Sequence, residues 1–310
     1  MKKATTNNRR KFLIDSARIA GAVAVASAIP LQSAGSAQEG TMEFVKLNNG
    51  VQMPILGLGT YNLRGKSGQN AISSAIKVGY RLIDTAQMYG NETEVGNAVS
   101  NAIKSGIPRE EFFITTKLSS NMSYDEVMKR FDDSMRKLNL NYLDLLLIHS
   151  NYRNSKEMYK AMEALHKNGK IKSLGLSNFN AEAFGDFVKN CEIIPAVNQC
   201  QTHIFYQQKA LREAMKESGT ILESWSPFVS GQNNFFKNPT LLSVAKKYNR
   251  SVAQVALRFL IQQGIIVIPK TANEQRMIEN ISVFDFSLNS DDMRTLEAMD
   301  TGKSAFSWDS

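Results

Sequence analysis

Eight short apolar runs recur along the chain, and segments with the 3.6-residue spacing of an amphipathic helix separate them. The runs are almost continuous in apolar residues rather than alternating, which is typical of parallel strands buried on both faces. They cover residues 53–60, 81–86, 111–118, 143–150, 171–178, 195–203, 220–227 and 265–271. The helical spacing is clearest over residues 125–140, 155–169 and 207–219.

This alternation predicts a parallel sheet, and eight strand–helix units predict an α/β fold closed into a (β/α)8 TIM barrel. An open doubly wound sheet is the alternative. Glycines fall just after helical runs, where a left-handed C-terminal cap favours glycine. They are Gly79, Gly106, Gly169, Gly219 and Gly264. Because no break in composition separates the units, we predict one barrel domain over residues 38–310.

Two further elements flank the eight units. Asn49-Gly50 lies between two short alternating stretches in residues 44–54, which predicts a β-hairpin with a type I′ turn that covers the barrel floor. Residues 287–300 start with a Ser/Asp cap and predict one more helix. A short C-terminal tail then runs to Ser310.

The first 37 residues have the plan of a signal peptide, with a basic start, an Ala-rich apolar stretch over residues 19–31 and small residues at 34–37. Arg9 and Arg10 precede Phe12-Leu13, and the segment resembles a twin-arginine export signal. We therefore predict periplasmic export of the folded protein and cleavage of residues 1–37. The stretch is too short and too Ala-rich to span a membrane. The alternatives are an uncleaved anchor, or a disordered basic tail and a cytoplasmic protein that starts at Met42.

The positive charge of the chain is concentrated in this leader. The formal net charge is +8, and residues 1–37 carry six basic side chains against Asp15, which leaves +3 for the remainder. No basic run with interleaved aromatic residues follows the leader, so we predict no nucleic-acid partner.

The cysteine and histidine contents are low. Cys191 and Cys200 invite a disulfide in an exported protein. Cys200 falls in a predicted strand, however, and a barrel that folds in the reducing cytoplasm needs no disulfide, so we expect two buried thiols. Because His149, His166 and His203 are scattered and form no Cys/His pair at ligand spacing, we predict no metal site.

Four polar residues, Asp84, Tyr89, Lys117 and His149, lie at or just past the ends of three successive apolar runs. The carboxyl ends of parallel strands meet at one face of a barrel, where its chemistry occurs. There the Lys117 ammonium would lower the phenol pKa of Tyr89 from about 10, Asp84 would keep the amine charged, and His149 would orient a carbonyl oxygen. Such a set can protonate a developing alkoxide. It contains no source of electrons, so a cofactor must supply them.

Seven segments in order resemble the aldo-keto reductase superfamily, and the similarity runs from about Met42 to Phe306. Within this family the chain is most similar to small bacterial reductases related to diketogluconate and methylglyoxal reductases. The segments are DTAQMYGNE (84–92), ITTKL (114–118), LDLLLIH (143–149), GLSNF (175–179), NQCQTH (198–203), SWSPF (224–228) and IPKTANEQRMIEN (268–280).

The resemblance implies an NADP-dependent carbonyl reductase in which Tyr89 is the general acid, Lys117 perturbs its pKa, Asp84 pairs with the lysine and His149 orients the substrate. It also implies a cofactor site, in which basic residues beside a hydroxyl favour NADPH over NADH. At the nicotinamide end, the carboxamide would be bound by Ser177, Asn178 and Gln199, and Trp225 would stack on the ring. At the adenosine end, the 2′-phosphate would be bound by Lys270, Thr271 and Arg276, and Glu279 and Asn280 would lie near the adenine. The site would be completed by Thr60, Ser226 and Phe228.

Departures from the family pattern bear on the substrate. Ser119-Ser120 follow the lysine where an aromatic residue is common, and Ser150-Asn151-Tyr152 follow the histidine where many members carry Trp and Pro. We therefore expect a wide, polar pocket for small polar carbonyls, keto-sugars or dicarbonyls, in a protein that acts as a monomer. The alternative functions are a nucleotide-sensing regulatory subunit without physiological turnover, or another barrel enzyme such as an isomerase.

Overall fold

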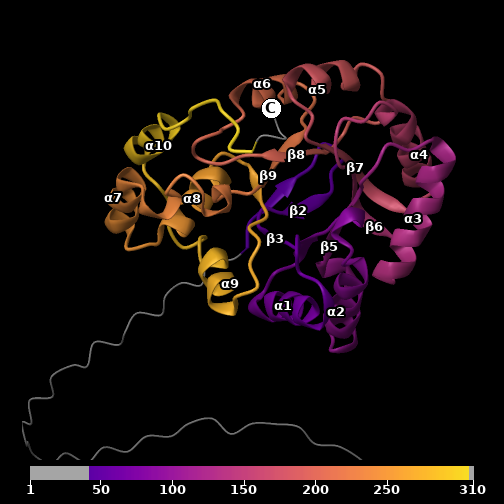
Figure 1. Ribbon diagram of the computed structural model, residues 1–310, viewed down its shortest axis with the longest axis horizontal. Helices are drawn as coiled ribbons and strands as arrows, with labels where there is room; N and C mark the ends of the chain where they lie inside the picture. The colour runs from indigo at the N-terminus through magenta and orange to yellow at the C-terminus, as the bar shows by residue number, and fades with distance from the viewer. Residues whose placement is uncertain (1–41, 307–310) are drawn as a thin grey trace, which may run out of the picture. The chain divides into compact units, whose positions relative to one another are not determined.

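The computed structural model describes residues 42–306, in which eight parallel strands lie inside a ring of helices (Figure 1). The strands are β3 (Gly57–Gly59), β4 (Leu82–Asp84), β5 (Phe113–Leu118), β6 (Leu143–Ile148), β7 (Ile171–Ser177), β8 (Val197–Gln201), β9 (Ile221–Trp225) and β10 (Ile266–Val267). Each pairs in parallel with the next strand in the chain.

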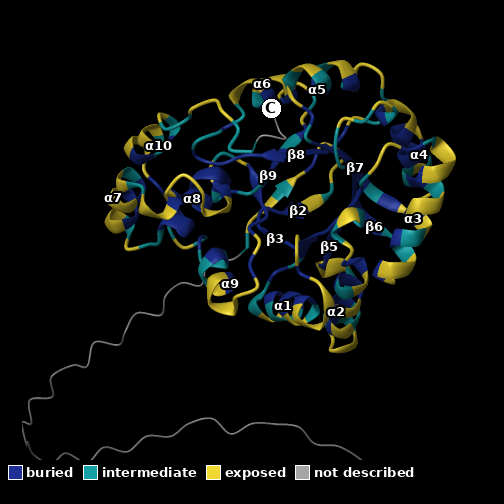
Figure 2. Cartoon of the chain, in the orientation of Figure 1, coloured by how far each residue is buried: buried dark blue, intermediate teal, exposed yellow. Residues whose placement is uncertain are grey.

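The sheet closes on itself between its first and last strands. Leu56, just before β3, forms a parallel bridge with Val267 in β10, and the Val267 amide donates to the Ile55 carbonyl at 2.9 Å. The predicted (β/α)8 barrel is therefore confirmed, and the open-sheet alternative is wrong. Nearly every strand residue is buried (Figure 2), in agreement with the continuous apolar runs in the sequence.

Helices cover the outside of the barrel, and most of them carry exposed residues on their outer side (Figure 2). They are α1 (Gly65–Val78), α2 (Glu92–Lys104), α3 (Tyr124–Leu138), α4 (Ser155–Lys167), α5 (Ala181–Val188), α6 (Lys209–Met215), α7 (Pro239–Tyr248), α8 (Val252–Ile261), α9 (Glu274–Ile281) and α10 (Ser290–Glu297). Local sequence sets their ends. In α3, for example, Ser123 and Glu126 form a capping box that satisfies the first amides.

The five glycines predicted to follow helical runs all have positive φ, as a left-handed turn requires. Two predicted helix limits are wrong. Helix α6 ends at Met215 rather than near Gly219. Helix α10 begins at Ser290 rather than at Ser287, and its cap is Asn289, whose side chain accepts from the Asp292 amide, in place of the predicted Ser/Asp cap.

The predicted hairpin is present and closes the end of the barrel opposite to the strand carboxyl ends. Strands β1 (Phe44–Lys46) and β2 (Gln52–Pro54) pair antiparallel. Asn48 donates to the carbonyls of Pro195 and Ser218, which precede β8 and β9. The predicted turn type is wrong, because Gly50 has a positive φ but Asn49 does not, and a type I′ turn needs both.

Strand β3 lies unusually close to its neighbours. A Cβ on Gly57 would come 2.3 Å from the Leu82 side chain, and one on Gly59 would come 2.7 Å from the Ile268 carbonyl oxygen. The two glycines therefore allow the barrel to close beside β10. Gly57-Leu58-Gly59 is thus a barrel strand and not a dinucleotide-binding loop.

The predicted leader, residues 1–37, lies outside the described residues. Within residues 42–306, no helix is long and apolar enough to cross a membrane. No disulfide joins Cys191 and Cys200. Cys200 is buried in β8 as expected, but Cys191 is only half-buried, because it lies in the loop after α5 rather than in a strand.

Candidate active site

The Lys117 ammonium is the centre of a buried cluster at the carboxyl end of the barrel. Its Nζ donates to Asp84 Oδ1 at 2.6 Å, to the Thr85 carbonyl at 3.0 Å and to the Tyr89 hydroxyl at 3.3 Å. Lys117 and Asp84 stand at the carboxyl ends of adjacent strands β5 and β4 and are almost fully buried, whereas Tyr89 ends the short helix η1 (Gln87–Tyr89). The fold therefore unites three of the four residues that the sequence selected.

Burial and charge keep this cluster in a proton-donating state. Burial disfavours the Lys117 ammonium, but the attraction of Asp84 and Tyr89 outweighs it and raises the lysine pKa. The expected fall in the Tyr89 pKa is wrong, since desolvation raises it above 10 despite the neighbouring ammonium. Tyr89 consequently remains a protonated phenol, which is the form that a general acid needs.

His149 completes the cluster immediately after β6. Its ring lies edge-on to Tyr89, with 5.8 Å between the ring centroids. Desolvation and the positive charge of Lys117 lower the His149 pKa to about 3. The imidazole is therefore neutral at physiological pH, and it can offer a hydrogen bond without carrying charge.

Glu223, in β9, is a site residue that the sequence interpretation missed. Gln199 Nε2 donates to both Asp84 Oδ2, at 2.9 Å, and Glu223 Oε2, at 3.0 Å. Burial, with a further contribution from Asp84, raises the Glu223 pKa to about 8. An ionisable residue inside the apolar run 220–227 was the available signal. Because Asp84 Oδ2 and Glu223 Oε2 both accept from Gln199 Nε2, the two acidic side chains orient the Gln199 amide.

Side chains from three strand ends form a second layer. Trp225 Nε1 donates to Asn178 Oδ1 at 2.8 Å, and Asn178 Nδ2 donates to the His149 carbonyl at 3.0 Å. Asn178 holds a left-handed φ of 60°, which asparagine tolerates. Ser177 is buried, and its hydroxyl donates to the Gln199 carbonyl at 2.8 Å. The Trp225 ring lies 5.5 Å from that of Phe306.

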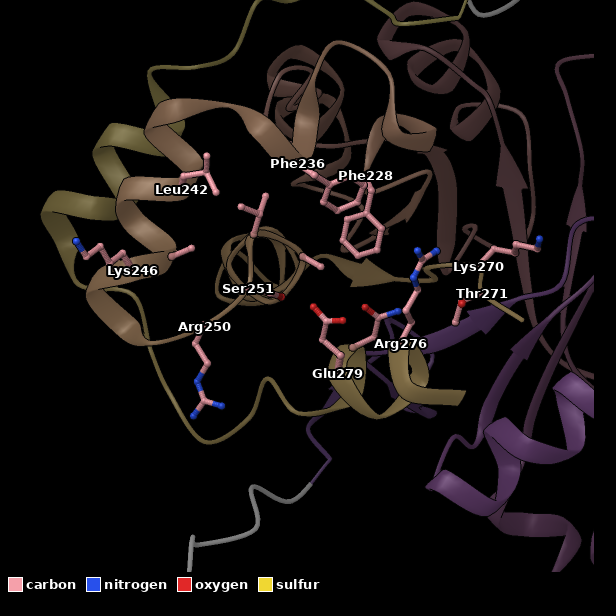
Figure 3. A pocket seen from close by; sticks show the side chains of 14 residues that line it. Phe228, Phe236, Leu242, Lys246, Arg250, Ser251, Lys270, Thr271, Arg276 and Glu279 are labelled. Carbon is pink, nitrogen blue, oxygen red and sulfur yellow. The ribbon is translucent and has the colours of Figure 1, made fainter. Parts of the chain in front are cut away.

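A separate pocket of about 620 Å³ lies beside α9 (Figure 3). Six of the predicted cofactor residues line it, namely Phe228, Lys270, Thr271, Arg276, Glu279 and Asn280. In Figure 3, Arg276 and Glu279 extend from α9 toward Phe228, whereas the Lys270 ammonium is directed away from them. The pocket combines basic, hydroxyl and aromatic side chains, which suits a phosphorylated ligand with a planar ring.

The other six predicted cofactor residues do not line this pocket; they are the four described above, Ser177, Asn178, Gln199 and Trp225, together with Thr60 and Ser226. Thr60 is buried after β3, and its hydroxyl donates to the Asp84 carbonyl at 2.8 Å. Ser226 follows β9 with a φ of 54°, and its hydroxyl lies 3.2 Å from that of Ser230. Lys270 nevertheless lies next to the barrel mouth, because its Cβ would be 3.6 Å from a Cβ on Gly59.

The geometry thus supplies a phenol backed by an ammonium, a neutral imidazole beside it and a cationic pocket. A phenol and an imidazole N–H can both donate to one oxygen atom that gains negative charge. No group of three or more His, Cys, Asp or Glu side chains that could hold a metal ion occurs in the described part of the chain.

Comparison with known proteins yields relatives over most of the chain. Residues 55–301 match the model of the aldo/keto reductase family. A glyoxal reductase of Bacillus subtilis is 43% identical over 258 residues, which are 82% of this chain and 92% of that protein. An aldo-keto reductase from a deep-sea metagenome has a TM-score of 0.81 at 41% identity, over 85% of this chain and 97% of the other. An aldo-keto reductase of Bombyx mori in complex with NADP has a TM-score of 0.80 at 34% identity, over 86% and 95%.

Proposed function

The chain belongs to the aldo/keto reductase family, and from that premise we propose that it reduces aldehydes and ketones to alcohols with NADPH. The observation that carries the proposal is the contact of a buried Lys117–Asp84 pair with the Tyr89 hydroxyl at 3.3 Å. That arrangement holds a protonated phenol at the barrel mouth, where a carbonyl oxygen can receive its proton.

When bound, NADPH supplies the hydride, and the residues of this chain handle the oxygen and its proton. Tyr89 donates its proton to the carbonyl oxygen as negative charge develops there. Lys117 stabilises the resulting phenolate, and Asp84 keeps the ammonium charged and directed. The neutral His149 donates a second hydrogen bond to the same oxygen, which holds the carbonyl in position.

The second layer and the cationic pocket fit this cofactor. Arg276 and Thr271 would hold the 2′-phosphate with Lys270, and Glu279 and Asn280 would lie against the adenine. At the other end, Trp225 would stack on the nicotinamide, while Ser177, Asn178 and Gln199 would bind its carboxamide. Gln199 is suited to that role, since its Nε2 donates to oxygen atoms of Asp84 and Glu223 and its Oε1 can accept from an amide.

We further propose small, polar carbonyl compounds, and dicarbonyls in particular, as substrates. Ser119 and Ser150 flank the catalytic lysine and histidine in place of bulky aromatic side chains, which leaves room and polar partners near the reacting oxygen. The 43% identity with a glyoxal reductase supports this class. We propose a monomer that is exported to the periplasm by the leader of residues 1–37.

A turnover assay with the purified protein tests the proposed function. We expect NADPH absorbance to fall on addition of glyoxal or methylglyoxal, with higher kcat/KM than for bulky aromatic aldehydes. A protein that binds NADPH but reduces none of these compounds would be a nucleotide-sensing subunit instead. A protein that does not bind NADPH would contradict both functions.

A further inference from the structure

Ser119 makes three polar contacts at the edge of the catalytic cluster. It immediately follows β5, and its Oγ lies 3.0 Å from Nδ1 of His149. The same oxygen accepts from the Met88 amide at 3.2 Å and lies 3.2 Å from the Lys117 carbonyl. The hydroxyl therefore lies where η1, β5 and the residue after β6 meet.

The backbone on both sides holds His149 in place. Its amide donates to the Leu118 carbonyl at 3.0 Å, and its carbonyl accepts from Asn178 Nδ2 at 3.0 Å. Because burial and Lys117 lower the His149 pKa to about 3, the neutral ring carries one proton at physiological pH. The remaining variable is which ring nitrogen carries that proton.

The contacts of Ser119 restrict this choice. The Met88 amide can only donate, so it occupies one lone pair of the hydroxyl. The single hydroxyl proton then goes either to His149 Nδ1, at 3.0 Å, or to the Lys117 carbonyl, at 3.2 Å. In the first arrangement the ring proton is on Nε2, and in the second it is on Nδ1. The shorter distance favours the first arrangement.

We propose that Ser119 is a positioning residue whose hydroxyl donates to Nδ1 of His149 and thereby keeps the ring proton on Nε2. The kinetic consequence rests on the proposed function. With the proton on Nε2, the substrate oxygen meets two donors, the Tyr89 hydroxyl and the His149 N–H. With the proton on Nδ1, Nε2 would present a lone pair that repels that oxygen.

Nitrogen-15 NMR of histidine in the full-length protein at neutral pH measures the tautomer without a turnover step. The signals of His149 are assigned by their absence in His149→Gln. His166 is an internal reference of the opposite tautomer, because its Nδ1 lies 2.8 Å from the Ile171 carbonyl, which can only accept. We expect the proton on Nε2 of His149, and a larger Nδ1–H fraction in Ser119→Ala. Ser119→Thr keeps the hydroxyl and should retain the parent tautomer.

Kinetics give the second readout. Loss of one neutral hydrogen bond should lower kcat/KM of Ser119→Ala for a small dicarbonyl by roughly two- to tenfold, with NADPH affinity unchanged and with recovery in Ser119→Thr. A parent His149 protonated on Nδ1 would overturn the inference, as would a Ser119→Ala protein with unchanged tautomer and unchanged kcat/KM. A parent protonated on Nε2 that reduces no carbonyl would contradict the proposed function while supporting the Ser119 assignment.

Discussion

Lys117→Met should strongly destabilise the protein, because the substitution leaves the buried Asp84 carboxylate without its cation. The two side chains are 0% and 2% exposed, with Nζ and Oδ1 2.6 Å apart. At that distance and an effective dielectric constant of ~20, their attraction is about 6 kcal/mol. Desolvation cancels part of this in the intact pair, but removal of one partner leaves the other charge buried, which typically costs about 3–5 kcal/mol.

Urea unfolding at neutral pH measures this loss, and the chain offers a matched control. Lys167 and Glu192 also lie 2.6 Å apart, but their side chains are 52% and 64% exposed. Lys167→Met should therefore cost less than about 1 kcal/mol. If both variants lost the same free energy of unfolding, burial would not be what makes the Lys117–Asp84 pair important, and the electrostatic reasoning would be refuted.

Three further outcomes are expected. Arg276→Ala should weaken NADPH binding roughly ten- to a hundredfold and leave NADH binding nearly unchanged. Equal losses of affinity in titrations with both nucleotides would show that Arg276 stabilises the structure and does not bind the 2′-phosphate. Native Glu223, with a pKa of about 8 against 4.5 when unfolded, stays protonated where the unfolded chain ionises, so the free energy of unfolding should fall by about 1.4 kcal/mol per pH unit between those values. Glu223→Gln should lack this slope in urea unfolding across that range, and equal slopes would refute the raised pKa. Replacement of Arg9 and Arg10 by Lys should abolish periplasmic export in cell fractionation, and export of processed double mutant would contradict the twin-arginine interpretation.

The barrel could be predicted because its signals are local and repeated. Strands β5 and β6 are buried throughout, with Lys117 next to the carboxyl end of β5 and His149 just after β6, and parallel pairing brings such ends together wherever they lie in the chain. The meeting of Asp84, Lys117 and His149 at one face of the barrel follows from that topology. The hairpin was also evident from Asn49-Gly50, although its turn type depended on the conformation of one residue.

Properties that depend on how deeply a side chain is buried, or on a contact made through an intervening residue, could not be predicted. The direction of the Tyr89 pKa depends on whether desolvation exceeds the effect of Lys117, and a sequence gives the charge but not the burial. Glu223 looked like part of a core strand, and only the folded barrel shows Gln199 between it and Asp84. Likewise, Ser119 was noted for its small size, whereas its contact with His149 became visible in the structure.

Turnover and NADPH binding of Tyr89→Phe, measured on the same preparation, test the central claim most directly. The substitution keeps the ring but removes the hydroxyl that Lys117 contacts at 3.3 Å. We predict that kcat for a small dicarbonyl falls by roughly 10²–10⁴, while NADPH affinity is retained because the proposed contacts of Trp225 and Arg276 are untouched. A variant that binds NADPH and turns over at nearly the parent rate would contradict Tyr89 as the general acid.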